Sequence, residues 1–151
     1  MFEFPKPTVL AALVSNVTET MCGVSFKPAA TGGGQEDLCW RTAVLPIKGA
    51  QPLRVALSSN KNGATALGAA LLGIHPESLD DEMINDALCE LLNMAAGQIK
   101  NALNLDQALG LPRILDLSAT PSGCEQVRRE GVLLRSVGDI DLVVWLSSDL
   151  Q

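Results

Sequence analysis

Residues 78–103 carry the pattern that most constrains how this chain can fold. Apolar residues recur there at the spacing of one helical face, at Ile84, Leu88, Leu91, Ala95 and Ala102. On a helical wheel the opposite face is polar and lies within about 40° of Asp86; its members are Asp86, Glu90, Asn93, Gly97 and Lys100. The pattern predicts a long helix that packs one face on a core and leaves the other free to contact something else.

The polar face combines a carboxylate, a carboxamide and a glycine at one-turn intervals, in Glu90, Asn93 and Gly97. A carboxylate can pair with a cation, and a carboxamide can donate to and accept from one water molecule, which suits a residue that positions a nucleophile. A glycine inside a helix costs about 1 kcal/mol relative to alanine, so it indicates either close approach by a neighbour or a tolerated defect. A solvated helix face is the alternative interpretation, and spacing alone does not decide between them.

Composition and charge bound the class of protein. A chain of 151 residues fits one domain, and its content of 47% hydrophobic and 19% charged residues is typical of a packed globule. The formal net charge is −6 and the basic residues do not cluster beyond Arg128-Arg129, which argues against a nucleic-acid or anionic-membrane partner. The longest apolar run near the N-terminus, residues 9–14, is too short to span a membrane, so we expect a cytoplasmic protein.

The residues of common catalytic and metal sites do not form known motifs. The four cysteines contain no Cys-x-x-Cys pair, so we expect reduced thiols and neither a metal site nor a redox pair; they are Cys22, Cys39, Cys89 and Cys124. The sole histidine, His75, has no nucleophile-elbow pattern to serve as a base. Gly32-Gly33-Gly34 is followed by Gln-Glu-Asp, which favours a flexible turn over a phosphate-binding loop.

The chain alternates helical and extended segments. Helices are predicted at residues 8–21 (ended by Gly23), 64–72 (closed by Gly73) and 78–103 (capped by Ser78 with Asp81). Extended segments are predicted at residues 24–28, 38–45, 53–58, 113–119, 125–137 and 140–146. Residues 141–145 are too apolar for an exposed edge strand, so we expect them at the centre of a sheet or against another subunit.

The two halves of the chain repeat one order of elements: a helix, a short strand and a long hairpin, with the short helix between the halves. Residues match at one place, where Ser15, Glu19 and Cys22 have the spacing of Asp86, Glu90 and Asn93. In this weak repeat Cys22 stands where the second half has its amide.

The pattern on the long helix resembles that of the CheC/CheX family of chemotaxis phosphatases, and of its CheX branch most closely. The family pattern is Asp or Ser, then Glu, then Asn, followed by a proline that opens a strand; Asp86, Glu90, Asn93 and Pro112 match it. Pro112 comes sooner than in the CheC pattern, and Pro121 is a second candidate. Over nearly the whole chain the resemblance implies an α+β sandwich of helices on an antiparallel sheet, with an internal pseudo-repeat. It implies one CheX-like domain over residues 1–151 and a homodimer.

The implied activity is hydrolysis of the aspartyl phosphate on a CheY-type receiver domain. By resemblance, Asn93 orients the attacking water and Glu90 pairs with a receiver lysine, while the receiver supplies Mg²⁺ and this chain binds no cofactor or metal. We add Asp86 and Gly97 as partner contacts, because they share the helical face. Because Cys22 replaces the amide in the first helix, we expect one active helix per chain.

Three alternatives remain open. The first is a scaffold like the middle domain of the flagellar switch protein FliM, which shares this fold but lacks the paired Glu and Asn. The second is a receiver-binding surface without turnover. The third is a small-molecule enzyme built on Asp116, Ser118 and Cys124, although no base accompanies these residues.

Overall fold

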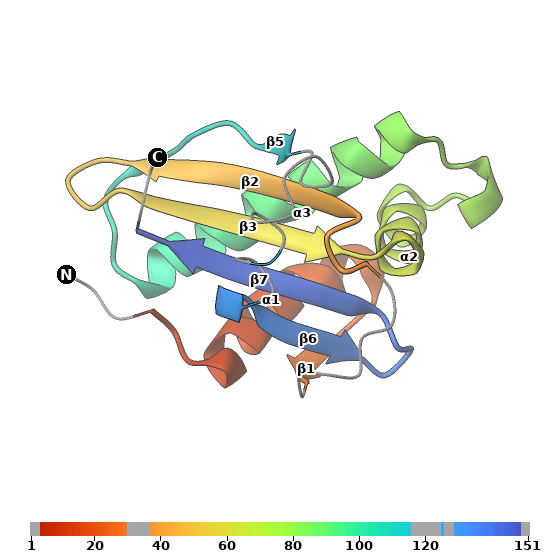
Figure 1. The fold of residues 1–151 in the computed structure, drawn as a ribbon, viewed down its shortest axis with the longest axis horizontal. Coiled ribbons are helices and arrows are strands. Elements are labelled where there is room, and N and C mark those ends of the chain that lie inside the picture. The colour runs from red at the N-terminus through yellow and green to blue at the C-terminus, as the bar shows by residue number, and fades with distance from the viewer. Residues whose placement is uncertain (1–3, 30–36, 116–124, 126–128, 149–151) are drawn as a thin grey trace.

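The computed structural model describes residues 4–29, 37–115, 125 and 129–148 of the chain (Figure 1). Its helices are α1 (Pro7–Cys22), α2 (Lys61–Leu72) and α3 (Asp81–Ala102), with a 3₁₀ turn η1 (Pro76–Ser78). Its strands are β1 (Phe26–Pro28), β2 (Arg41–Lys48), β3 (Leu53–Ser59), β4 (Ala108–Leu109), β5 (Arg113–Leu115), β6 (Val132–Ser136) and β7 (Asp141–Ser147). Three helices packed on an antiparallel sheet confirm the predicted fold class.

The sheet has the strand order β1-β6-β7-β3-β2-β4, and β5 also pairs with β2. The hairpin β2–β3 belongs to the first half of the chain and the hairpin β6–β7 to the second, and the two meet where β3 pairs with β7. Each short strand crosses over: β1 pairs with β6 of the second half, and β5 pairs with β2 of the first. The order helix, short strand, hairpin therefore occurs twice, as predicted.

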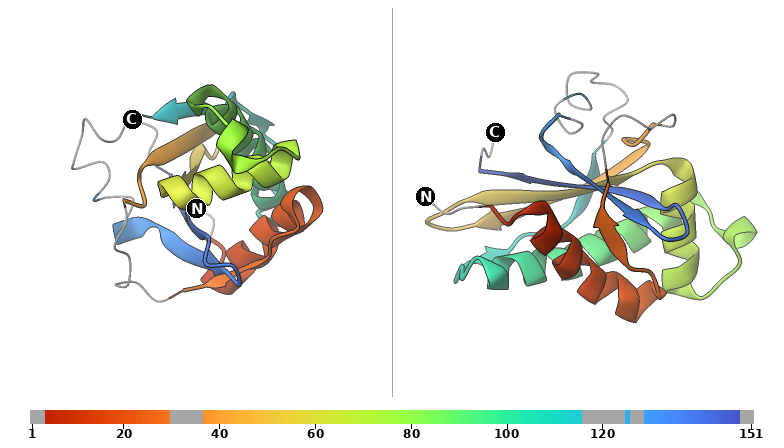
Figure 2. Two further views of the ribbon diagram at one scale, coloured as in Figure 1. Left: turned by 90° about the vertical axis from the view of Figure 1, so that its right-hand side faces the viewer. Right: turned by 90° about the horizontal axis from the view of Figure 1, so that it is seen from below.

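Helices α1 and α3 lie on the same face of the sheet (Figure 2), and α2 lies at one end, where it contacts both. The main apolar core fills the space between these helices and the sheet. A smaller apolar cluster lies on the other face of the sheet, formed by Cys39, Val44, Ala56, Leu133, Val143 and Trp145. Strand β7 lies between β6 and β3, so residues 141–145 occupy the centre of the sheet, one of the two predicted positions.

Helix α3 buries one face along nearly its whole length. The buried residues are Ile84, Ala87, Leu88, Leu91, Leu92, Ala95, Ala96 and Ile99. Helix α2 packs on α3 near Gly68, where an added Cβ would lie at an ordinary contact distance of 3.7 Å from the Cβ of Ala87. Ala102 is exposed, contrary to the prediction, because α3 ends there.

Helix boundaries differ from the sequence prediction where polar caps decide them. Helix α3 begins at Asp81 rather than Ser78, because the Asp80 carboxylate accepts a hydrogen bond of 2.8 Å from the amide of Met83. Helix α2 begins at Lys61 rather than residue 64, because the Asn60 side chain accepts a hydrogen bond of 2.8 Å from the amide of Gly63. Gly23 and Gly73 close their helices with φ of 70° and 67°, as predicted.

Strand boundaries shift as well. Strand β2 begins at Arg41 and continues to Lys48, three residues later than expected at each end. Residues 129 and 130 are helical, so β6 begins at Val132 and not within 125–131. Strand β4 was not predicted. It pairs with the end of β2, and the amide of Gly110 donates to the carbonyl of Pro46 at 2.6 Å.

The prediction of four reduced cysteines is wrong at Cys39, which is disulfide-bonded. Cys22 and Cys89 are free thiols, and spacing gave no sign of a pairing between cysteines distant in sequence. Several predicted features lie outside the described residues: Gly32–Gly34, residues 116–119, Pro121 and Cys124. Within the described part of the chain, no helix combines the length and the apolar character needed to cross a bilayer.

Candidate functional site

Helix α3 presents the four predicted site residues on its open face. Asp86, Glu90 and Asn93 are exposed, and Gly97 is half-buried. None of the three side chains makes a hydrogen bond or ion pair in the described part of the chain. We call these four residues the α3 stripe. Its side chains stand on a helix whose opposite face is buried, and they are free to contact a partner.

The start of α3 is fixed to the sheet by Arg41, at the beginning of β2. Its Nε donates a hydrogen bond of 2.9 Å to the side-chain oxygen of Asn85, and its guanidinium lies 3.3 Å from the carboxylate of Asp81. The guanidinium also stacks over Trp40, with 4.1 Å between its carbon and the ring centroid. Sequence reasoning missed this anchor, because Arg41 and Asn85 lie 44 residues apart.

Gly97 is not required by the packing of this chain. A Cβ built at this position would meet no atom within 4 Å. The helix itself does not favour a glycine either, since alanine at this position would be more stable by about 1 kcal/mol. The fold therefore leaves open space beside Gly97.

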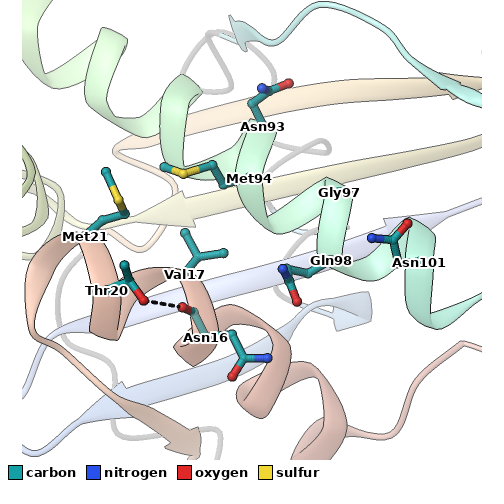
Figure 3. Close-up of a pocket in the computed structure, with 9 residues that line it drawn as sticks. All are labelled: Asn16, Val17, Thr20, Met21, Asn93, Met94, Gly97, Gln98 and Asn101. Carbon is teal, nitrogen blue, oxygen red and sulfur yellow. Dashed lines mark hydrogen bonds between the residues drawn. The ribbon is translucent and has the colours of Figure 1, made fainter.

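A groove of about 360 Å³ lies between α1 and α3, along one edge of the stripe (Figure 3). Its lining carries no charged side chain and consists of Asn16, Val17, Thr20 and Met21 of α1 with Asn93, Met94, Gly97, Gln98 and Asn101 of α3. Figure 3 shows Asn93 at the upper edge of the groove, with its carboxamide directed away from α1. The α1 residues were not among the predicted site residues, because sequence spacing does not reveal which helices lie side by side.

The corresponding positions of α1 are used within the fold. The Ser15 hydroxyl is buried and accepts a hydrogen bond of 2.9 Å from the amide of Phe26. Glu19 accepts a hydrogen bond from the Ser25 hydroxyl, and the half-buried Cys22 thiol donates to the carbonyl of Leu67 at 3.8 Å. These contacts tie α1 to β1 and α2, so its version of the motif does not offer free side chains as the stripe does.

Other reactive groups near the stripe do not form a catalytic set. Burial, and then the charge of Asp86, raises the pKa of the Cys89 thiol, which therefore stays protonated at neutral pH. His75 is exposed and caps η1, where its Nδ1 accepts from the amide of Glu77 at 3.4 Å. No three His, Cys, Asp or Glu side chains gather into a metal-binding group among the residues described.

Solved structures share this fold. A chemotaxis protein CheX from Vibrio vulnificus matches with a TM-score of 0.66 and 18% identity, covering 96% of this chain and 97% of that one. CheX from Desulfovibrio desulfuricans matches with a TM-score of 0.63 and 19% identity, covering 93% and 95%. A chain of the CheX–CheY–BeF3–Mg²⁺ complex from Borrelia burgdorferi matches with a TM-score of 0.69 and 13% identity, covering 97% and 98%.

At these identities the structural matches establish the fold alone, and no curated protein matches the sequence. The family assignment comes from the sequence itself. The profile described as "Chemotaxis phosphatase CheX" matches residues 41–129, a span that includes the whole of α3 and all four residues of the stripe. The chain belongs to the CheX family of chemotaxis phosphatases.

Proposed function

We propose that this protein hydrolyses the aspartyl phosphate of a CheY-type receiver domain and that the α3 stripe carries the chemistry. The observation that carries this proposal is the exposure of Glu90 and Asn93, without partners in the described chain, on one face of a helix inside the matched family region. The Borrelia burgdorferi structure of similar fold is a complex of CheX with CheY, BeF3 and Mg²⁺, which supports a receiver as the partner.

In this proposal Asn93 positions the attacking water. Phosphoryl transfer requires an in-line nucleophile and neutralised charge more than covalent chemistry from the protein. A carboxamide can accept a hydrogen bond from a water and donate one to a phosphoryl oxygen without changing its protonation state. Asn93 is exposed, so its side chain can enter the receiver's site when α3 docks there.

Glu90 anchors the helix by pairing with a lysine of the receiver. Glu90 precedes Asn93 by three residues, which places the two side chains about 4.5 Å apart along the axis and on the same side. A charge-assisted hydrogen bond at this point fixes the register of α3, and the register determines where the Asn93 carboxamide lies. Asp86 and Gly97 extend the same contact, and Gly97 lets the receiver surface come close to the helix backbone.

The receiver supplies the Mg²⁺ that neutralises the phosphoryl group, and this chain holds no cofactor of its own in the proposed reaction. Mg²⁺ is bound by one or two carboxylates together with phosphoryl oxygens. Those ligands belong to the phosphorylated receiver in this scheme. Each chain offers one active helix, because the equivalent residues of α1 bond within the fold.

The test is the rate of phosphate loss from a phosphorylated CheY-type receiver of the same organism. We expect wild-type protein to accelerate the loss and Asn93→Ala to abolish the acceleration. Glu90→Gln should reduce it strongly. Glu82→Gln makes the same change at another exposed glutamate of α3, two turns earlier, and should leave the rate unaffected.

Two results would contradict the proposal. A receiver that binds tightly without losing phosphate faster would make the protein a docking module, with Glu90 and Asn93 serving only as contacts. A melting temperature lowered by many degrees in Asn93→Ala would show that the residue is structural, whereas an exposed helical Asn should be replaced by Ala at little cost.

A further inference from the structure

We infer that the receiver-binding surface extends beyond the α3 stripe across the α1–α3 groove, so that Asn16 and Thr20 of α1 contact the receiver and help to set its affinity. The inference rests on the proposed function and adds a second helix to it. It assigns a role to the α1 side of the groove, which the motif on α3 does not include.

The stripe and the groove are continuous. Asn93 and Gly97 belong to both, because they line the groove and lie on the open face of α3. A specific interface covers about 800 Å² on each partner, which corresponds to a disc of about 16 Å radius. Packed helices lie only about 8–10 Å apart, so a footprint centred on Asn93 reaches α1.

The lining of the groove indicates the chemistry of the segment that it receives. It holds no charged side chain, whereas the neighbouring open face of α3 carries Asp86 and Glu90. The side-chain amides of Asn16, Gln98 and Asn101 make no hydrogen bond within the described chain and can both donate and accept.

Apolar contact is available beside these amides. Val17 is a buried residue of α1 that lines the groove, and Met21 and Met94 add flexible thioether side chains that adapt to a partner's shape. Figure 3 shows Met94 extending from α3 toward Met21 of α1. Amide side chains around an apolar strip can bind an uncharged segment of the receiver. In such a segment, exposed backbone groups would pair with the amides and a small apolar side chain would contact the strip.

Two variants of α1 test this inference without touching the stripe. Thr20→Arg places a long charged side chain in the groove, and Asn16→Asp adds a charge with almost no change in shape. Both residues are exposed, so the helix should still fold. Thr8→Arg is the matched control, because it makes the same change on an exposed residue of α1 about 18 Å away along the axis.

The measurements are the steady-state kinetics of dephosphorylation and the affinity for a CheY-type receiver loaded with beryllofluoride and Mg²⁺. We expect Thr20→Arg and Asn16→Asp to weaken binding and raise KM about tenfold while kcat stays within about twofold, since they lie outside the reacting groups. Thr8→Arg should behave as wild type. Asn93→Ala should show the opposite pattern, with kcat lost and binding largely kept.

The failure of this inference is distinguishable from the failure of the proposed function. Wild-type turnover combined with unchanged KM and affinity in both groove variants would show that the receiver does not cover α1. Altered self-association of Thr20→Arg by sedimentation, with receiver affinity unchanged, would assign the groove to a second copy of this chain and overturn the inference. Receiver binding without turnover would contradict the proposed function, and the affinity measurements would still test the groove.

Discussion

Asn93 and Cys22 occupy equivalent positions in two similar helices but meet different surroundings. The Cys22 thiol is half-buried against α2, and burial raises its pKa. The Asn93 carboxamide faces outward without a partner in the described chain. The two halves of this protein therefore place one of these equivalent residues in contact with the fold and leave the other exposed at the surface.

Gly97→Ala separates stability from function at the residue scale. The new Cβ meets no atom of the chain, and alanine is the better helix former, so the free energy of unfolding should rise by up to about 1 kcal/mol. If the receiver approaches the helix backbone here, kcat/KM should fall about tenfold, or about 1.4 kcal/mol. Urea denaturation and phosphatase assays on the same sample check both effects.

Gly63→Ala provides the contrast for that experiment. Gly63 is buried at the start of α2, and a Cβ there would lie 2.9 Å from the backbone carbonyl oxygen of Asp141. This variant should therefore unfold more easily. A Gly97→Ala protein that is destabilised in the same way would show that Gly97 serves the fold and not a partner.

Asp86→Asn should make the Cys89 thiol more reactive. The negative charge of Asp86 adds to burial in raising the pKa of this thiol, so removing the charge lowers the pKa and increases the thiolate fraction at pH 8. We expect faster alkylation of Cys89 by iodoacetamide, followed by peptide mass spectrometry. Cys22, whose pKa is raised by burial alone, is the internal control and should react at an unchanged rate.

At the element scale, α3 shows how far a sequence pattern reaches. Its two faces follow from residue spacing, which is a local property, and Ile84, Leu88, Leu91 and Ala95 are buried as predicted. Its first residue was missed, because Asp80 and not Ser78 accepts the capping hydrogen bond. Its anchor on Arg41 and the groove beside α1 depend on segments distant in sequence, so spacing could not predict them.

Leu91→Ala tests the assignment of the buried face of α3. Leu91 is 2% exposed, so truncation should lower the free energy of unfolding by about 2–5 kcal/mol through lost burial and a residual cavity. Leu72→Ala, at a side chain that is 45% exposed at the end of α2, should cost much less. Similar losses in the two variants, measured by chemical denaturation, would contradict the assignment.

The whole molecule joins its two halves through one sheet. Extended runs predicted the hairpins, and the apolar character of residues 141–145 predicted either the centre of a sheet or a contact with another subunit, of which the structure shows the first. The sequence contained no equivalent signal for β4 or for the disulfide of Cys39, because both depend on contacts made only after the chain has folded. The roles of Glu90 and Asn93 were inferred by resemblance and remain predictions.

The predicted homodimer is a property of the whole molecule and is tested by the mass of the protein in solution. Light scattering on the purified protein should give a mass near twice 15.9 kDa at micromolar concentration. Thr8→Arg and wild type should give the same mass. A mass of one chain across the concentration range used in the phosphatase assay would show that a monomer is the working form and would exclude the homodimer.

The crossing of the two short strands makes the two halves of the chain depend on each other. Strand β1 completes the hairpin of the second half, and β5 completes that of the first. A peptide of half this length would leave its own hairpin without a neighbour and could gain one only from another copy. The two halves are therefore intertwined, and each depends on the other for a neighbour of its hairpin.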